Sequence, residues 1–332
     1  MPPLVSILIP VYNCEAWVSA AIRSALAQTW PNKEVIVFDD GSTDGTLDIV
    51  RSFGTQIQFE SRRLGGQNVS RNRLIELSRG DWLVFLDADD ELMPYNVEAK
   101  LTCAREADVL YGSIEMARFS GRDKTNSYVA RAVEQTDLWS AAFGWSLPNT
   151  SAMMFRRTAL LDVGGWPTDF ENCTDYALYF TLLLKNYRFR AVPEALSLYR
   201  HWSSSQASYE NMSRKNIAKI DLLCSTGREL CKRAGFTPRS LRIWSDRILQ
   251  CVRILYRGHP SKAHEGLKCI CEVNPGYCPA PPEFSRLYSL AFRLCGFYVA
   301  QRLADKSRNV RQALGMSGSQ EPHPVTLVEK ST

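Results

Sequence analysis

The chain has 332 residues, of which 45% are hydrophobic and 23% are charged, with a formal net charge of +5. This composition is that of an ordinary soluble globular protein. No stretch approaches ~18–20 uninterrupted apolar residues, so the sequence predicts no membrane span. The amino terminus enters an apolar segment without a basic region, which argues against a signal peptide. The ten cysteines are scattered, and the nearest group, Cys269, Cys271 and Cys278, lacks the paired spacing of a zinc site.

The first hundred residues alternate between apolar runs and helix-forming segments. An apolar run from Val5 to Asn13 predicts a buried strand ended by Pro10, and residues 16–28 predict a helix. A second apolar run, residues 34–38, is followed by an acidic, glycine-rich turn at 39–46 that can cap another helix near Asp44. This order of strand, helix, strand and helix predicts βαβ units with a parallel sheet.

A third apolar run, residues 81–86, ends in three carboxylates: Asp87, Asp89 and Asp90. Residues i and i+2 of a strand share a face, so the Asp-x-Asp pair can converge on one cation or nucleotide, although a solvated acidic turn is the alternative. In open parallel sheets, ligands bind outside the carboxyl ends of the strands. Residues 12–13, 39–40 and 87–89 all fall at such ends.

Four ordered blocks together resemble the inverting glycosyltransferases of family 2, which have the GT-A fold. The blocks are Val5 to Asn13, Val35 to Asp44, Gly66 to Arg73 and Leu86 to Asp90. The resemblance covers about residues 4–205 and implies an α/β fold, with a mostly parallel central sheet and helices on both faces. The remaining third carries no matching motif and is expected to be a helical extension.

The resemblance implies a nucleotide-sugar site at the strand ends. Pro10, Tyr12 and Asn13 would form a wall of the base pocket with Glu15 close by, and Asp40 would accept a hydrogen bond from the base. Arg71 would contact the nucleotide, since a guanidinium suits a base carbonyl or a phosphate. The structural alternatives are a helix cap for Asp44 and a solvated basic face for Arg71.

The acidic block is expected to bind the donor's diphosphate through a divalent cation. In the Asp87-Ala88-Asp89 segment, Asp87 would hold the ribose or the metal and Asp89 would bind the metal. Carboxylate, phosphate and water ligands favour Mn²⁺ or Mg²⁺. The stretch from Tyr199 to Ser203 resembles a segment that closes over the diphosphate, with a spacing that differs by one residue. Arg200 is therefore the expected anion contact, and His201 is either a further metal ligand or a surface histidine.

Transfer with inversion needs a general base for the acceptor hydroxyl. The resemblance assigns this role to Asp175, at the start of a helix predicted over 175–185. Relatives commonly have Glu-Asp at this point, whereas this chain has Thr174-Asp175, and Thr174 as a helix N-cap is the structural alternative. Asp169 and Glu171 are reserve carboxylates.

The carboxyl-terminal region is basic and helical. Residues 210–311 hold 19 Lys or Arg against 8 Asp or Glu. Helices are predicted over 209–233, 238–256, 262–273 and 284–311. An apolar stripe on the last helix is expected to face the core, and contact with an anionic membrane surface is the alternative; its members are Leu287, Leu290, Ala291, Leu294 and Tyr298. The predicted divisions are a GT-A domain at 1–208, a helical region at 209–312 and a disordered tail at 313–332.

Together these features predict a cytoplasmic glycosyltransferase that uses a nucleoside diphosphate sugar, with uridine the expected nucleoside. The acceptor would be a hydroxyl of a carbohydrate or of a lipid-linked carbohydrate. A sugar-nucleotide pyrophosphorylase is disfavoured because the first strand lacks a glycine-rich basic loop after it. A non-catalytic nucleotide-binding relative is the other alternative, suggested by Thr174. Nucleic-acid binding is not expected, since no aromatic and basic platform accompanies the charge.

Overall fold

The computed structural model describes residues 2–63, 65–170, 172–202 and 212–313. The chain divides into two compact units. The first consists of Met1–Leu138 and Leu147–Glu210, and the second consists of Trp139–Ser146 and Asn211–Thr332. The predicted tail lies, from residue 314 onward, outside the described residues.

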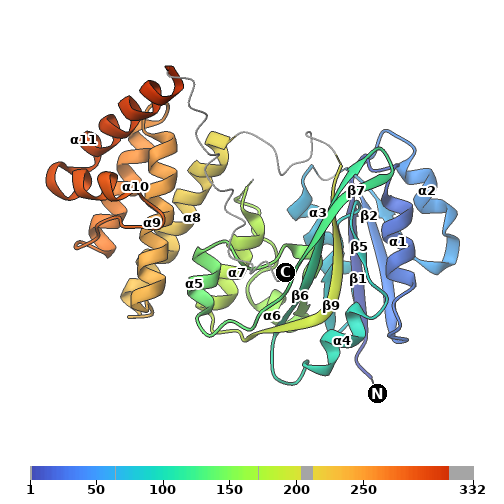
Figure 1. Ribbon diagram of the computed structural model, residues 1–332. Helices are drawn as coiled ribbons and strands as arrows, with labels where there is room; N and C mark the ends of the chain where they lie inside the picture. The colour runs from blue at the N-terminus through green and yellow to red at the C-terminus, as the bar shows by residue number, and fades with distance from the viewer. Residues whose placement is uncertain (1, 64, 171, 203–211, 314–332) are drawn as a thin grey trace. The chain divides into compact units, whose positions relative to one another are not determined.

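A nine-stranded mixed sheet organises the first unit (Figure 1). Its strands are β1 (Val5–Val11), β2 (Lys33–Asp39), β3 (Gln58–Ser61), β4 (Trp82–Phe85), β5 (Glu91–Leu92), β6 (Val109–Ser120), β7 (Asp123–Ala130), β8 (Met153–Arg156) and β9 (Phe189–His201). The order is β3-β2-β1-β4-β8-β6-β9-β5, and β7 pairs with β6. The pairs among β3, β2, β1 and β4 are parallel, as predicted. Beyond β4 only the β6–β9 pair is parallel, because β8, β7 and β5 join antiparallel to their neighbours.

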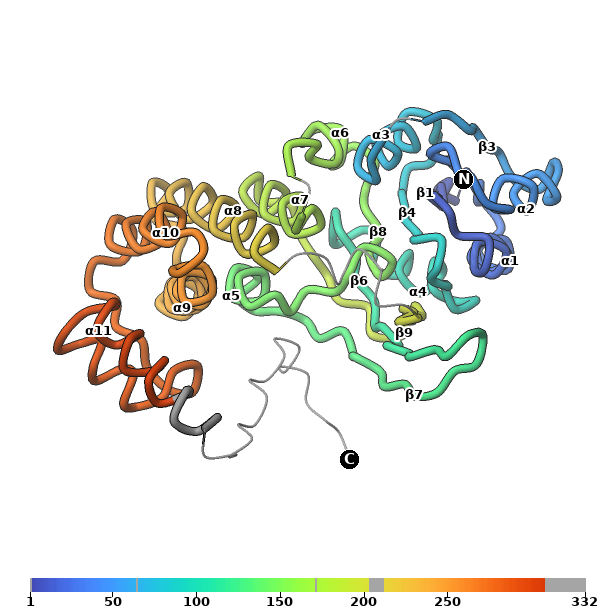
Figure 2. The backbone as a smooth tube through the Cα atoms, turned by 90° about the horizontal axis from the view of Figure 1, so that it is seen from above, coloured from blue at the N-terminus to red at the C-terminus, as the bar shows by residue number. Residues whose placement is uncertain are grey.

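Helices lie on both faces of this sheet, which confirms the predicted α/β fold class. The sheet is mixed rather than mostly parallel, since four of the eight strand pairs in the described residues are antiparallel. Figure 2 shows α3 and α6 on one side of β1 and β4, and α1 and α4 on the other. The helices of the unit are α1 (Val18–Leu26), α2 (Thr46–Ser52), α3 (Gln67–Leu77), α4 (Asn96–Thr102), α6 (Arg157–Asp162) and α7 (Thr174–Leu184), with 3₁₀ turns η1 (Gly54–Gln56) and η2 (Thr150–Ala152). All seven residues of β1 are buried, as expected for a central strand covered on both faces. Ile7 and Ile9 share one apolar cluster with Val18 and Ile22 of α1.

The second unit is helical. Its helices are α5 (Leu138–Phe143), α8 (Met212–Lys232), α9 (Pro238–Leu255), α10 (Pro260–Val273) and α11 (Arg286–Ala313). α9 begins with a capping box in which Thr237 and Ser240 each bond to the other's backbone N–H. No helix in the described residues combines the length and the apolar character needed to cross a membrane.

Two expectations about this second unit are corrected. The segment 139–146 was placed in the first domain, but it groups with the second unit. Phe143 stacks on Phe236 at 5.9 Å, and Arg247 Nη2 donates to the Gly144 carbonyl at 3.0 Å. The stripe on α11 was expected to face the core, yet Leu287 and Leu294 are both 72% exposed. The side of α11 that packs inward is instead formed by neighbouring aromatic residues, among them Tyr288 and Phe297.

Candidate active site

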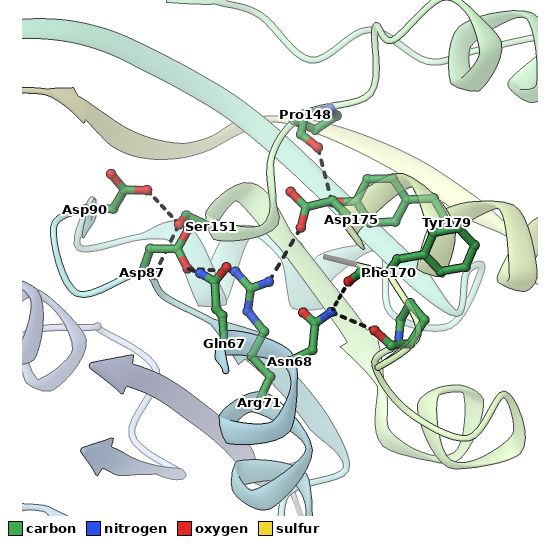
Figure 3. Close-up of polar contacts among 11 residues, drawn as sticks. Gln67, Asn68, Arg71, Asp87, Asp90, Pro148, Ser151, Phe170, Asp175 and Tyr179 are labelled. Carbon is green, nitrogen blue, oxygen red and sulfur yellow. Dashed lines mark hydrogen bonds and ion pairs between the residues drawn. The ribbon is translucent and has the colours of Figure 1, made fainter. Parts of the chain in front are cut away.

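The acidic loop after β4 has three carboxylates in three different environments, and Figure 3 shows two of them, Asp87 and Asp90. Asp87 Oδ1 accepts from Arg71 Nη2 at 2.9 Å and from Gln67 Nε2 at 3.4 Å. Asp89 Oδ2 accepts from Trp202 Nε1 at 2.9 Å. Asp90 is fully buried, and burial together with the charges of Asp89 and Asp87 raises the pKa of its carboxyl. This loop is an ordered polar structure and differs from the solvated turn that was its alternative.

Arg71 links the acidic loop to the candidate base. Its guanidinium is only 2% exposed, and its Nη1 lies 3.6 Å from Asp175 Oδ1 while Nη2 bonds to Asp87. The guanidinium carbon sits 4.3 Å from the centre of the Trp166 ring. The alternative interpretation, in which Arg71 belongs to a solvated basic face, is therefore wrong. What the structure shows is a buried cation shared by two carboxylates, and the predicted nucleotide contact stays a prediction.

The amino-terminal half of α3 positions this cation. Residues 71 and 72 follow residue 68 by three and four positions, so all three lie on one face of the helix. Asn68 Nδ2 donates to the Pro167 carbonyl at 2.6 Å, and Asn72 exchanges hydrogen bonds with the backbone of Trp166 at 2.7 and 2.9 Å. Gly165 is required here, because its φ is +79° and an added Cβ would lie 2.5 Å from Asn72 Oδ1. The segment before α7 is thus held against α3.

Asp175 lies in the first turn of α7, where its carboxylate is 29% exposed. Burial raises the pKa of Asp175, and the Arg71 charge opposes this rise. The N-cap is Cys173, at φ 60°, and makes no side-chain cap bond, so the alternative in which Thr174 caps the helix is wrong. A partly exposed carboxylate with a raised pKa is suited to accept a proton. Of the reserve carboxylates, Asp169 is exposed, and Glu171 lies outside the described residues.

The residues predicted for the base pocket lie on adjoining loops after β1 and β2. Tyr12 is 58% exposed. Asn13 Oδ1 accepts from the Thr43 backbone N–H at 2.8 Å, and Glu15 Oε2 accepts from the Gly45 N–H at 2.8 Å. Asn13 and Glu15 therefore tie the two loops together. Pro10 pairs in register with Phe38 on β2, directly behind these loops.

Asp40 connects the loop after β2 to the start of α3. Its two carboxylate oxygens accept from the backbone N–H groups of Gly65 and Gly66 at 2.9 and 2.8 Å. This arrangement brings the second and third motif blocks together. Hydrogen bonding of Asp40 to a nucleotide base stays a prediction.

Arg200 holds the acidic loop from inside the protein. It is 4% exposed, its Nη1 donates to the Asp89 carbonyl at 2.8 Å, and Nη2 pairs with Glu91. The guanidinium lies 4.9 Å from the Trp17 ring centre. The predicted anion contact has no support in this placement, because the guanidinium is buried and occupied by protein groups.

The predicted metal ligands are not gathered into one cluster. In the part of the chain that the structure describes, no group of three or more His, Cys, Asp or Glu side chains could hold a metal ion. His201 packs edge-on against Tyr199, with ring centres 4.8 Å apart, and burial lowers the pKa of its imidazole. Ala88, between the two acids, is 7% exposed. Any metal bound here would take one or two carboxylates from the protein, with diphosphate oxygens completing its shell, as is common for Mg²⁺.

A buried chain of polar groups supports the acidic loop from α4. Lys100 Nζ donates to Asn96 Oδ1 at 2.7 Å, and Asn96 Nδ2 donates to Ser197 Oγ at 3.1 Å. Ser197 Oγ donates to the Ser151 carbonyl at 2.9 Å, and Ser151 Oγ donates to Asp90 Oδ2 at 2.7 Å. Apart from Asp90, none of these residues belongs to a motif, so the sequence did not point to Lys100, Asn96, Ser151 or Ser197. The only available signal was a lysine and an asparagine one helical turn apart.

Replacing Lys100 by methionine should change how stability depends on pH. Burial lowers the pKa of Lys100 to about 7, whereas an unfolded lysine titrates near ~10.4. Between these values the unfolded state binds more protons, so the unfolding free energy of the parent protein rises with pH. The parent should therefore gain roughly 3 kcal/mol relative to Lys100→Met between neutral pH and pH ~10, measured by urea unfolding. If the unfolding free energies of the parent and of Lys100→Met changed in parallel over this pH range, Lys100 would have to stay protonated in the folded protein.

Comparisons with known proteins agree with this geometry. Residues 6–164 match the family model described as glycosyl transferase family 2. The crystal structure of residues 1–349 of TarS from S. aureus, in complex with UDP-GlcNAc, superposes with a TM-score of 0.64 over 92% of each chain, at 16% identity. That identity shows the fold alone.

Two curated relatives are named as sugar transferases. An uncharacterized glycosyltransferase, alr2836 of Nostoc sp., is 27% identical over 256 residues, which cover 71% of this chain and 78% of the relative. The UDP-Glc:alpha-D-GlcNAc-diphosphoundecaprenol beta-1,3-glucosyltransferase WfaP of Escherichia coli is 29% identical over 234 residues, which cover 68% of this chain and 87% of the relative. Residues 6–164 thus form a glycosyl transferase family 2 domain, and the first unit has the GT-A fold. The chain is a glycosyltransferase, which sets aside the pyrophosphorylase and the non-catalytic relative.

Proposed function

We propose that the protein transfers a sugar, with inversion, from a nucleoside diphosphate donor to a hydroxyl of a carbohydrate or lipid-linked carbohydrate. The observation that carries this proposal is the arrangement in which Arg71 joins Asp87, at the end of β4, to Asp175, at the start of α7. The complex of TarS with UDP-GlcNAc supports a uridine diphosphate donor. The name of WfaP supports an acceptor on a lipid diphosphate.

In the proposed reaction, Asp175 takes the proton of the acceptor hydroxyl as its oxygen attacks the anomeric carbon. The bond from that carbon to the diphosphate oxygen breaks, and its electron pair leaves with the diphosphate. Arg71 keeps Asp175 near the donor site and holds Asp87 at a fixed distance from it. Direct displacement through one base inverts the anomeric configuration.

The carboxylates of Asp87 and Asp89 have the donor chemistry to hold Mn²⁺ or Mg²⁺. When bound, such a cation would supply electrostatic stabilisation of the departing diphosphate. Trp202 orients Asp89 through a hydrogen bond of 2.9 Å, and Arg200 fixes the backbone at the same residue. The proposed metal site thus uses carboxylates that the surrounding residues have already ordered.

Asp89→Asn should weaken metal-dependent nucleotide binding. Losing one charged oxygen ligand should lower the affinity for uridine diphosphate by at least about tenfold in the presence of Mn²⁺ and leave it little changed with chelator. Isothermal titration calorimetry with a panel of nucleoside diphosphates measures both effects. Asp48→Asn, an 87% exposed carboxylate on α2, is the matched control. Equal affinities of Asp89→Asn and the parent with Mn²⁺ would remove Asp89 from the metal site.

A further inference from the structure

The outward side of α11 carries exposed apolar side chains on both of its helical segments. Its large apolar side chains are between 51% and 72% exposed. They are Leu287, Leu290, Leu294, Tyr298 and Leu303, and together they define the outer face of α11. Scattered exposed leucines are ordinary on protein surfaces, but Leu287, Leu290 and Leu294 follow one another at helical spacing on the segment before Gly296, and such a row marks an interaction surface.

This exposure does not come from loose attachment of the helix. Its inner side carries buried Tyr288, Phe297 and Gln301. Arg253 of α9 lies 4.7 Å from the Tyr288 ring centre and donates through Nε to Gln301 Oε1 at 3.0 Å. Tyr256, also next to α9, packs edge-on against Phe297 at 6.0 Å. The packing therefore sets which face of α11 points outward.

The exposed charged residues that α11 itself carries are all basic. Within residues 286–307, whose side chains the structure describes, the exposed charged residues are Arg286, Arg293, Arg302 and Lys306. In the same range the acidic residue is Asp305, which faces α9, where it pairs with Arg257 at 2.6 Å and accepts from Tyr256. The outer face thus presents leucine and tyrosine flanked by positive charge.

We propose that the outer face of α11 docks on an anionic lipid surface. Leucine side chains would enter the boundary between headgroups and acyl chains, while the long arginine and lysine side chains reach the phosphates. Gly296 interrupts the helical backbone with φ 75°, so the face consists of two successive helical segments. A second copy of this chain is a poorer occupant, because two-fold pairing of identical faces would bring the same arginines together.

Lipid docking would place the enzyme where a lipid-linked acceptor resides. This last step rests on the proposed acceptor class, whereas docking itself does not. Vesicle binding measured without donor or acceptor therefore tests the docking alone. Donor turnover in detergent solution tests the proposed function alone.

The test is co-sedimentation of the full chain with vesicles of phosphatidylcholine, or of phosphatidylcholine mixed equally with phosphatidylglycerol. The parent should bind the anionic vesicles and lose that binding as salt is raised. Leu290→Ser/Leu294→Ser should weaken binding about tenfold or more. Arg293→Gln/Arg302→Gln should weaken it about 25-fold, since each basic residue near the surface contributes about fivefold.

Leu161→Ser is the matched control, because this leucine is 49% exposed on α6, outside the outer face. It should bind vesicles as the parent does. Thermal unfolding checks that each variant is folded. Arg293→Gln/Arg302→Gln is the less disruptive of the two double variants, because both arginines are exposed. Absence of parent binding, or unchanged binding by both double variants, overturns the proposal. A dimer in light scattering that Leu290→Ser/Leu294→Ser dissolves would assign the face to a second copy instead.

Discussion

Asp175→Asn should abolish sugar transfer while leaving donor binding intact. An asparagine keeps the shape of the side chain but cannot accept the acceptor's proton, and general-base catalysis contributes roughly 10²–10⁴-fold. Transfer should fall by that factor, and the affinity for uridine diphosphate should stay within about twofold. Transfer is measured as diphosphate release in the presence of acceptor, and binding is measured by calorimetry.

The pH profile of the parent enzyme gives an independent check on this base. Because burial raises the pKa of Asp175, the acid limb of kcat/KM should lie above the range of an ordinary aspartate. Activity is then present when Asp175 is ionised and is lost as the pH falls through its raised pKa. Asp169→Asn, which changes an exposed carboxylate on the preceding loop, should behave like the parent. Retained turnover in Asp175→Asn, or its loss in Asp169→Asn, would move the base to another residue.

Arg71→Met should destabilise the first unit and impair catalysis together. Methionine fills a similar volume, but it leaves Asp87 and Asp175, 22% and 29% exposed, without their shared cation. Removing one partner from a buried ion pair costs about 3 kcal/mol in unfolding free energy. The pKa of Asp175 should rise further, because Arg71 opposes the effect of burial. The acid limb of the activity profile should therefore move to higher pH.

Arg73→Met provides the comparison for this variant on the same helix. Arg73 is 32% exposed and pairs near the surface with Glu60 at 2.8 Å and with Glu76 at 2.7 Å, so its loss should cost much less stability than the loss of buried Arg71. Urea unfolding of the two variants separates a buried bridge from a surface pair. Similar stability losses in both would contradict a special role for Arg71. If the acid limb of the pH–activity profile stayed in place in Arg71→Met, Arg71 would have no effect on the pKa of the proposed base, Asp175.

The sequence indicated where the site lies but not how its residues are held. The motif blocks follow strands whose parallel order is dictated by their apolar runs, so Asp40, Asp87 and Asn13 meet at one edge. Periodicity could not show that Arg71 and Arg200 are buried, because burial of an arginine depends on partners far away in the chain. Arg71 meets Asp175 across 104 positions, and Arg200 meets Asp90 across 110.

The leucine stripe of α11 illustrates a different limit. Periodicity shows that leucines share a face of a helix, but it does not show which face packs inward. Here the aromatic residues Tyr288 and Phe297 form the packed side, and the leucines are left outside. The segment 139–146 likewise gave no local sign that its aromatic residues belong with the second unit.

β9 contacts β5 and the acidic loop, which lie about a hundred residues earlier in the chain, and this separation affects how the protein folds during synthesis. β5 pairs with β9, and the acidic loop receives Arg200 and Trp202 from the end of that strand. During synthesis the loop emerges more than a hundred residues before these partners do. Contacts so distant in sequence form slowly and late in folding. The acidic loop can therefore reach its folded conformation only after nearly the whole first unit has been synthesised. A shortened chain that stops before β9 would contain the acidic motif but lack the contacts that position it.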